Sequence, residues 1–111
     1  MIDPDLLIRN LCTQRYHIID GFLESELCQS LRKTANKMYE QGLFRSAKIG
    51  LNLELQKNNT IRADEIFWLN GDEIDQAISA FLGQMRHLIQ IVNQSLFLGL
   101  NEFETHFAIY Q

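Results

Sequence analysis

The stretch IRADEIFWL, residues 61–69, carries the side chains of this sequence whose types and spacing could do chemistry. Arg62, Asp64 and Trp68 are separated by even numbers of residues, and alternate residues of a β-strand share a face. A strand over 61–69 would therefore place a cation, a carboxylate and an indole on one side. Such a set can pair charges and wall a binding pocket, and an ion pair beside a core indole would account for the same residues.

The other residues form no recognisable catalytic or metal-binding motif. The histidines are His17, His87 and His106, and none has a second histidine four residues away or an acid at the His-x-Asp spacing. The sequence also has no Cys-x-x-Cys pair, no glycine-rich phosphate loop and no Gly-x-Ser-x-Gly elbow. We therefore expect this sequence to contain no catalytic residue and no metal ligand.

Length and charge narrow the class of protein. A chain of 111 residues corresponds to a single domain, 1–111, and 46% hydrophobic residues are enough for a core. The net charge of −4 and the scattered basic residues argue against a nucleic-acid partner. No apolar run approaches a membrane span and no signal peptide is visible. Two cysteines make no disulfide framework, which favours a cytoplasmic location.

Three segments have apolar residues at helical spacing. Asp3, followed by Pro4, is the expected N-cap of a first helix, and Gly42 is the expected C-terminal cap of the second. Asp72, in the sequence Asn-Gly-Asp, is the expected N-cap of the third and longest helix. The sequence thus predicts helices over about 4–14, 24–41 and 73–96.

Strands are expected between and after these helices, at about 16–22, 44–49, 61–69 and 103–110. The last alternates Phe103, Thr105, Phe107 and Ile109 with more polar residues, and it should pair with either 16–22 or 61–69. Residues 44–60 could form a hairpin or a mobile loop. The predicted class is α+β, with helices packed on one side of the sheet.

The order of these segments resembles a known enzyme family. The pieces YHIIDGFL, ELCQSLRK, YEQGLF, IRADEIFWL and FETHFAIY, with a long helix before the last, look like the front of a prolyl 4-hydroxylase-type iron(II)/2-oxoglutarate dioxygenase. The branch with the hypoxia-inducible-factor prolyl hydroxylases is the most similar. The resemblance runs from about Tyr16 to Tyr110, and its most specific part is the ordered set Arg62, Asp64 and Trp68.

The resemblance implies a fold and a set of site residues. The sheet would be an incomplete double-stranded β-helix, or jelly roll, with 44–60 as a mobile loop over the substrate. Arg62, Asp64 and Trp68 would lie at the substrate side or rim of the active site. Tyr110 would be the tyrosine whose hydroxyl reaches 2-oxoglutarate; a tyrosine at a strand end with a hydrated hydroxyl is the alternative.

The resemblance also implies cofactors and a substrate. The complete enzyme would use iron(II) and 2-oxoglutarate, with ascorbate left open, to hydroxylate a prolyl residue of a protein. The family's His-x-Asp, its distal histidine and its basic 2-oxoglutarate ligand come later in the chain than Tyr110. The sequence is therefore expected to be an amino-terminal portion that binds no cofactor and is inactive alone.

Two other interpretations of the sequence stay open. One is a non-enzymatic α+β interaction module that pairs its terminal strand with a partner or a second copy. The other is a degenerate, iron-free relative of the oxygenases. If the chain is instead the front of a longer oxygenase, the strand at 103–110 lacks its neighbours, and we expect the isolated chain to self-associate or to have a frayed terminus.

Overall fold

The computed structural model describes residues 2–46 and 64–110, and these form helices and one antiparallel sheet. The elements are α1 (Pro4–Thr13), α2 (Ser25–Glu40), β1 (Arg45–Ser46), β2 (Glu65–Leu69), α4 (Gln76–Leu96) and β3 (Thr105–Ile109). The helices and the sheet confirm the α+β class. The double-stranded β-helix is not established by the described residues, which contain three strands of one sheet in the order β1-β2-β3.

The predictions for the first two helices are confirmed, together with their caps. The Asp3 side chain accepts a hydrogen bond from the backbone N–H of Leu6 at 3.2 Å, at the start of α1. At the end of α2, the N–H of Gly42 donates to Tyr39 and that of Leu43 to Met38, which is a Schellman motif. Gly42 has φ +76°, a conformation that glycine adopts without a Cβ clash.

The predicted N-cap of the long helix is wrong. α4 begins at Gln76, and Asp75 caps it by accepting from the N–H of Ile78 at 3.0 Å. Asp72 instead lies in the preceding turn, where its N–H donates to the Asn70 side chain. The other carboxylate oxygen of Asp75 accepts from the Thr34 hydroxyl at 2.9 Å, so one side chain both starts α4 and ties it to α2.

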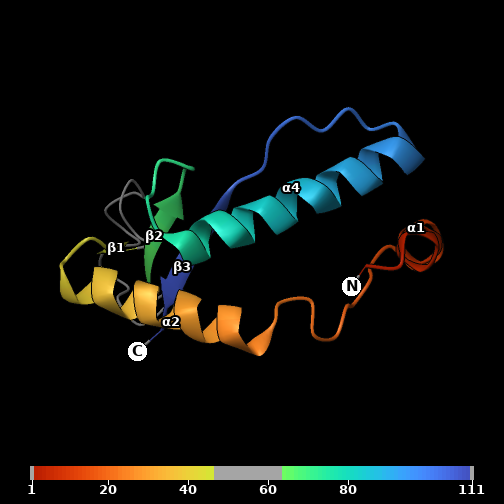
Figure 1. The fold of residues 1–111 in the computed structure, drawn as a ribbon. Coiled ribbons are helices and arrows are strands. Elements are labelled where there is room, and N and C mark those ends of the chain that lie inside the picture. Colours follow the sequence, from red (N-terminus) through yellow and green to blue (C-terminus); the bar gives the residue numbers. More distant parts are fainter. Residues whose placement is uncertain (1, 47–63, 111) are drawn as a thin grey trace.

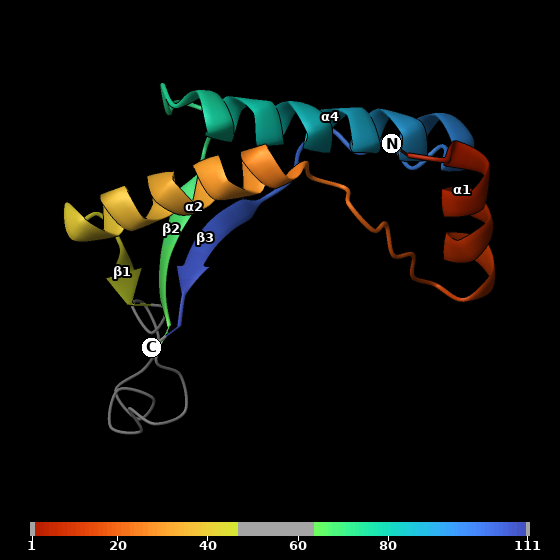
Figure 2. The ribbon, with the colours of Figure 1, turned by 60° about the horizontal axis from the view of Figure 1, so that its bottom comes forward.

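The predicted strand at 16–22 is also wrong. These residues form an irregular connection from α1 to α2, with the expected turn at Asp20 and Gly21. The side chains of Tyr16 and Ile18 are largely exposed, so the apolar pattern of this segment does not mark a buried strand face. The connection runs beside α4, where Phe22 and Gly83 line the same pocket, and away from the sheet (Figure 2).

The last strand pairs antiparallel with β2, one of the two partners that the sequence left open. Phe67 lies opposite Phe107, and Leu69 lies opposite Thr105. β3 covers Thr105–Ile109 and β2 covers Glu65–Leu69, so both are shorter than predicted. The alternation predicted for the last strand is confirmed, since Phe107 and Ile109 are more buried than His106 and Ala108.

The core lies between one face of the sheet and helices α2 and α4 (Figure 1). Its centre is formed by Leu69, Ile78 and Leu82, with Phe67 and Phe107 of the sheet packed against them. α1 packs on the far part of α4, away from the sheet (Figure 2). The two larger helices therefore cover one face of the sheet, as predicted. The opposite face is the candidate functional site.

Candidate functional site

The face of the sheet opposite α2 and α4 (the outer face) carries two of the side chains that the sequence marked for chemistry, Trp68 and Tyr110. Its residues are Arg45 from β1, Ile66 and Trp68 from β2, and His106, Ala108 and Tyr110 from β3 and the residue after it. Figure 2 shows both helices on the other side of these two strands. Trp68 is 52% exposed and Tyr110 76% exposed, so this face presents aromatic surface to solvent.

Trp68 forms a pair with a histidine that sequence reasoning left without a role. The two residues are directly opposite in the β2–β3 register, and their ring centroids are 4.7 Å apart at an interplanar angle of 61°. An edge-to-face arrangement of this kind is favourable for aromatic rings. His106 was missed because only the strand register brings it to Trp68, and the sequence does not state the register.

Asp64 lies at the other end of the same two strands. It directly precedes β2, and it is 2% exposed, with an interaction partner in the structure. Because Glu65 pairs with Ile109, continuing the register puts Asp64 opposite Tyr110. A four-residue strand step is roughly 13 Å, so Asp64 and Trp68 mark the two ends of the outer face rather than one contact.

The predicted site residues are thus only partly brought together. Asp64 and Trp68 belong to one strand segment, as the spacing indicated, but one is buried and the other half-exposed. Tyr110 follows β3 at the Asp64 end, with its side chain exposed. Arg62 lies outside the described residues, as do positions 47–60 of the predicted mobile loop. Of that loop, Phe44 is buried and Arg45–Ser46 form β1, which pairs with β2.

Helix-side packing fixes the strand that carries Asp64 and Trp68. Phe44 is buried, with its ring edge-to-face with Tyr39 at 5.7 Å and close to the rings of Phe67 and Phe107 at 6.0 and 6.5 Å. The Tyr39 hydroxyl also donates to the Glu65 carboxylate at 3.0 Å. These contacts join the end of α2 to β2 and β3 and so set the position of the outer face.

The described part of the chain lacks the ligand set of a metal site. Within residues 2–46 and 64–110, no three His, Cys, Asp or Glu side chains come together around one point. His106 and Asp64 lie at opposite ends of the outer face, so they do not converge on one ion. The described residues therefore do not fit an iron site, and iron chemistry is not assigned to them.

Comparison with solved structures gives a close match in fold. The crystal structure of a Pseudomonas putida prolyl-4-hydroxylase superposes on 96% of this chain with a TM-score of 0.76 and 29% sequence identity. The chain has a prolyl-4-hydroxylase-like fold. It spans 52% of the length of that enzyme chain, about half. No family model and no curated protein sequence matches it.

This likeness supports the resemblance seen in the sequence at the level of a prolyl-4-hydroxylase-like dioxygenase relative. The match extends over nearly all of the chain, so it includes the helices and the sheet together rather than one hairpin.

Among the described residues, no helix is long and apolar enough to cross a membrane.

Proposed function

We propose that this chain is the amino-terminal portion of an iron(II)/2-oxoglutarate-dependent dioxygenase that hydroxylates a prolyl residue in a protein. The observation that carries the proposal is the superposition of nearly the whole chain on about half of the Pseudomonas prolyl-4-hydroxylase. The membership of the hypoxia-inducible-factor-like branch and a cytoplasmic location are further parts of the proposal. They rest on the sequence resemblance and on the cysteine content.

The outer face of β2 and β3 is the surface that would line the cavity of such an enzyme. It is the face that the helices leave free, and it carries an exposed indole, a histidine and a phenol. The Tyr110 hydroxyl can donate a hydrogen bond to a carboxylate of 2-oxoglutarate. Arg62, Asp64 and Trp68 would border the substrate, Trp68 by apolar contact and Asp64 by holding the start of β2.

The remaining chemistry is assigned to residues beyond those of this chain. Iron(II) and 2-oxoglutarate, with ascorbate left open as an auxiliary reductant, supply the oxidation when bound in the complete enzyme. The contribution of this chain is to position the outer face and to exclude water from it. We expect the 111-residue protein on its own to release no succinate from 2-oxoglutarate.

A hybrid enzyme tests the proposal. Residues 1–111 would replace the segment of the Pseudomonas enzyme that superposes on them, and succinate release would be measured with iron(II), 2-oxoglutarate and a proline-containing peptide. The proposal expects iron-dependent succinate release from the hybrid, and the unmodified Pseudomonas enzyme is the positive control. In the hybrid, Tyr110→Phe should raise the KM for 2-oxoglutarate.

Two results would contradict this proposal. The first is a folded hybrid that binds iron(II) and 2-oxoglutarate and yet produces no succinate. The second is an iron-dependent release of succinate by the 111-residue chain alone, because the chain would then hold its own active site.

A second function is favoured by the position of β3. Among the described residues, β3 is an edge of the sheet, and its neighbouring surface exposes Trp68 and Tyr110. An apolar edge strand can add a strand from another protein or from a second copy. A non-enzymatic interaction module, or a degenerate iron-free oxygenase relative, would use this edge and would leave the hybrid inactive.

A further inference from the structure

A second candidate site lies on the helix side of the sheet, away from the outer face. A cavity of about 470 Å³ opens between α4 and the two connections that join α4 to β2 and to β3. This volume is in the range of small-molecule pockets. We call it the Arg86 cavity; the residues on which the argument depends are Leu69, Leu82, Arg86, Ile89, Glu102 and Phe103.

Both connections that wall the Arg86 cavity are held by hydrogen bonds. The Asn93 side chain of α4 donates to the carbonyl of Leu100 at 2.7 Å and accepts from its N–H at 2.8 Å. In the other connection, the Glu73 carboxylate accepts from the N–H groups of Asn70 and Gly71 at 3.2 and 3.1 Å. The cavity is therefore bounded by two anchored turns rather than by loose surface loops.

One part of the lining of the Arg86 cavity, which we call its floor, is apolar; the rest is polar and includes the amide side chains of Asn70, Gln90, Asn93 and Asn101. Leu69 and Leu82 are core residues, 8% and 6% exposed, and Ile89 and Phe103 complete the surface. On α4, Leu82, Arg86 and Ile89 follow one another at spacings of four and three, which puts them on one helix face. A small aliphatic group lying on this floor would be removed from water.

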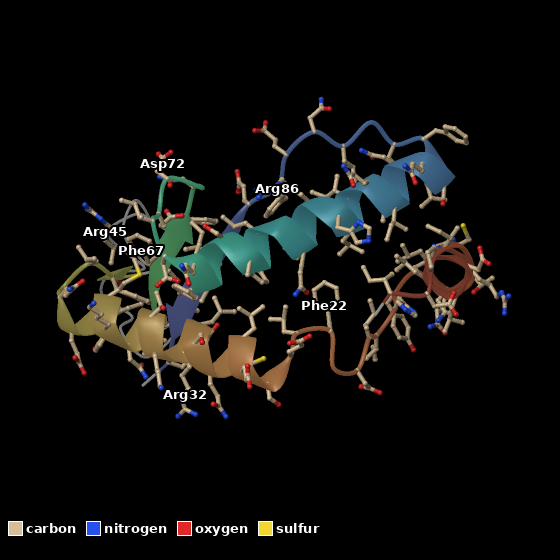
Figure 3. The ribbon with its side chains drawn as sticks, viewed as in Figure 1. Phe22, Arg32, Arg45, Phe67, Asp72 and Arg86 are labelled. Atoms are coloured by element: carbon tan, nitrogen blue, oxygen red, sulfur yellow. The ribbon has the colours of Figure 1, made fainter. Side chains whose placement is uncertain are left out.

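The lining of the cavity also contains a positively charged side chain. Arg86 is the one basic residue in the lining that the described residues form, and its guanidinium has no hydrogen bond or ion pair with any of them. In Figure 3, Arg86 lies on the part of α4 next to the β3 connection, whereas Arg32 lies on the far side of α2. An exposed guanidinium without a partner among the described residues, beside apolar surface, suits a carboxylate, which it can bind through two parallel hydrogen bonds.

We propose that the Arg86 cavity binds a small organic anion, with its carboxylate on Arg86 and a short branched aliphatic body against Leu82, Ile89 and Phe103. This site is separate from the outer face, so it does not depend on the proposed dioxygenase function. Glu102 lies in the same lining and carries the same charge as the ligand. Its carboxylate therefore weakens the binding of the anion.

The experiment titrates the 15N-labelled 111-residue protein with three probes and follows amide chemical shifts by NMR. 4-Methylpentanoate carries both the charge and the aliphatic body, 4-methyl-1-pentanol carries the body alone, and acetate carries the charge alone. The pentanoate should bind with the highest affinity and shift the amides of Arg86, Ile89 and Phe103. Equal affinities for the pentanoate and the alcohol would overturn the proposal, because Arg86 would then contribute nothing.

Single substitutions test the site independently, because the affinity for 4-methylpentanoate should fall in one variant and rise in another. Arg86→Gln should weaken pentanoate binding by about tenfold and leave the alcohol unaffected, since a charge-assisted pair is lost. Glu102→Gln should strengthen pentanoate binding, and Arg32→Gln is the matched control that should change nothing. All three residues are exposed, so the folded state is retained. An unchanged affinity in Arg86→Gln, or a weaker one in Glu102→Gln, would exclude this site.

Discussion

At the residue scale, Asp75 has a larger structural role than the sequence revealed. Asp72 and Asp75 are both followed by residues that can continue a helix, so a local pattern cannot choose between them. Asp75 is selected because its second carboxylate oxygen meets the Thr34 hydroxyl of α2. That contact joins residues 41 positions apart, and only the packing of the two helices brings them together.

Replacing the capping carboxylate should therefore cost stability. Asp75→Ala removes the bond from the N–H of Ile78 and the bond from Thr34, and we expect the free energy of unfolding to fall by about 1–2 kcal/mol. Asp72→Ala is the matched control; it removes an exposed side chain and should stay within about 0.5 kcal/mol of wild type. Urea unfolding followed by circular dichroism would measure both. An equal loss in the two variants would contradict the capping role of Asp75.

Replacing Gly83 should increase the free energy of unfolding, in contrast to replacing Asp75. It lies within α4, and a Cβ built on it would have no heavy atom within 4 Å other than its own helix surroundings. Gly83→Ala should raise the free energy of unfolding by about 0.5–1 kcal/mol, because alanine loses less conformational freedom in a helix. Gly42→Ala, at φ +76°, should lower it. Thermal unfolding of both variants tests the pair, and a destabilised Gly83→Ala would show that α4 needs the glycine for another reason.

At the scale of the elements, the helices could be predicted apart from the start of α4, whereas the sequence only narrowed the partner of the last strand to two segments. Helical periodicity and caps are local, and they located α1 and α2 within a residue or two of their bounds. Strands depend on partners far away in sequence, so the apolar segment 16–22 was assigned to a sheet that it does not join. The pair of Trp68 and His106 was beyond prediction for the same reason, since it requires the β2–β3 register.

The two faces of the sheet should differ in their contribution to stability. Phe44→Ala removes a buried ring that contacts Tyr39, Phe67 and Phe107, and we expect a loss of about 3 kcal/mol or more. Trp68→Ala removes a larger but half-exposed ring from the outer face, with an expected loss below about 1.5 kcal/mol. Chemical denaturation would give both values. A greater loss from Trp68→Ala would mean that the outer face, rather than the helix side, holds the strands.

At the scale of the whole molecule, the helices among the described residues cover one face of the sheet. α2 and α4 bury Phe67, Leu69 and Phe107, whereas Trp68 and Tyr110 on the outer face remain exposed (Figure 2). Exposed aromatic surface next to an edge strand favours contacts with other chains. In the proposed enzyme the outer face borders a cavity, so the same surface would be covered by further structure.

The 111-residue protein should therefore associate with itself in a concentration-dependent way through β3 and the outer face. Ala108 is an exposed residue of that face, opposite Ile66, and Ala108→Lys puts a charge there without removing a buried contact. Light scattering should give a mass for this variant near the monomer value of 12.9 kDa, with larger masses for wild type at high concentration. Gln94→Lys adds the same charge at an exposed position of α4 and should behave as wild type. If wild type is monomeric at every concentration, the outer face does not drive association, and the interaction-module alternative loses the observation that favours it.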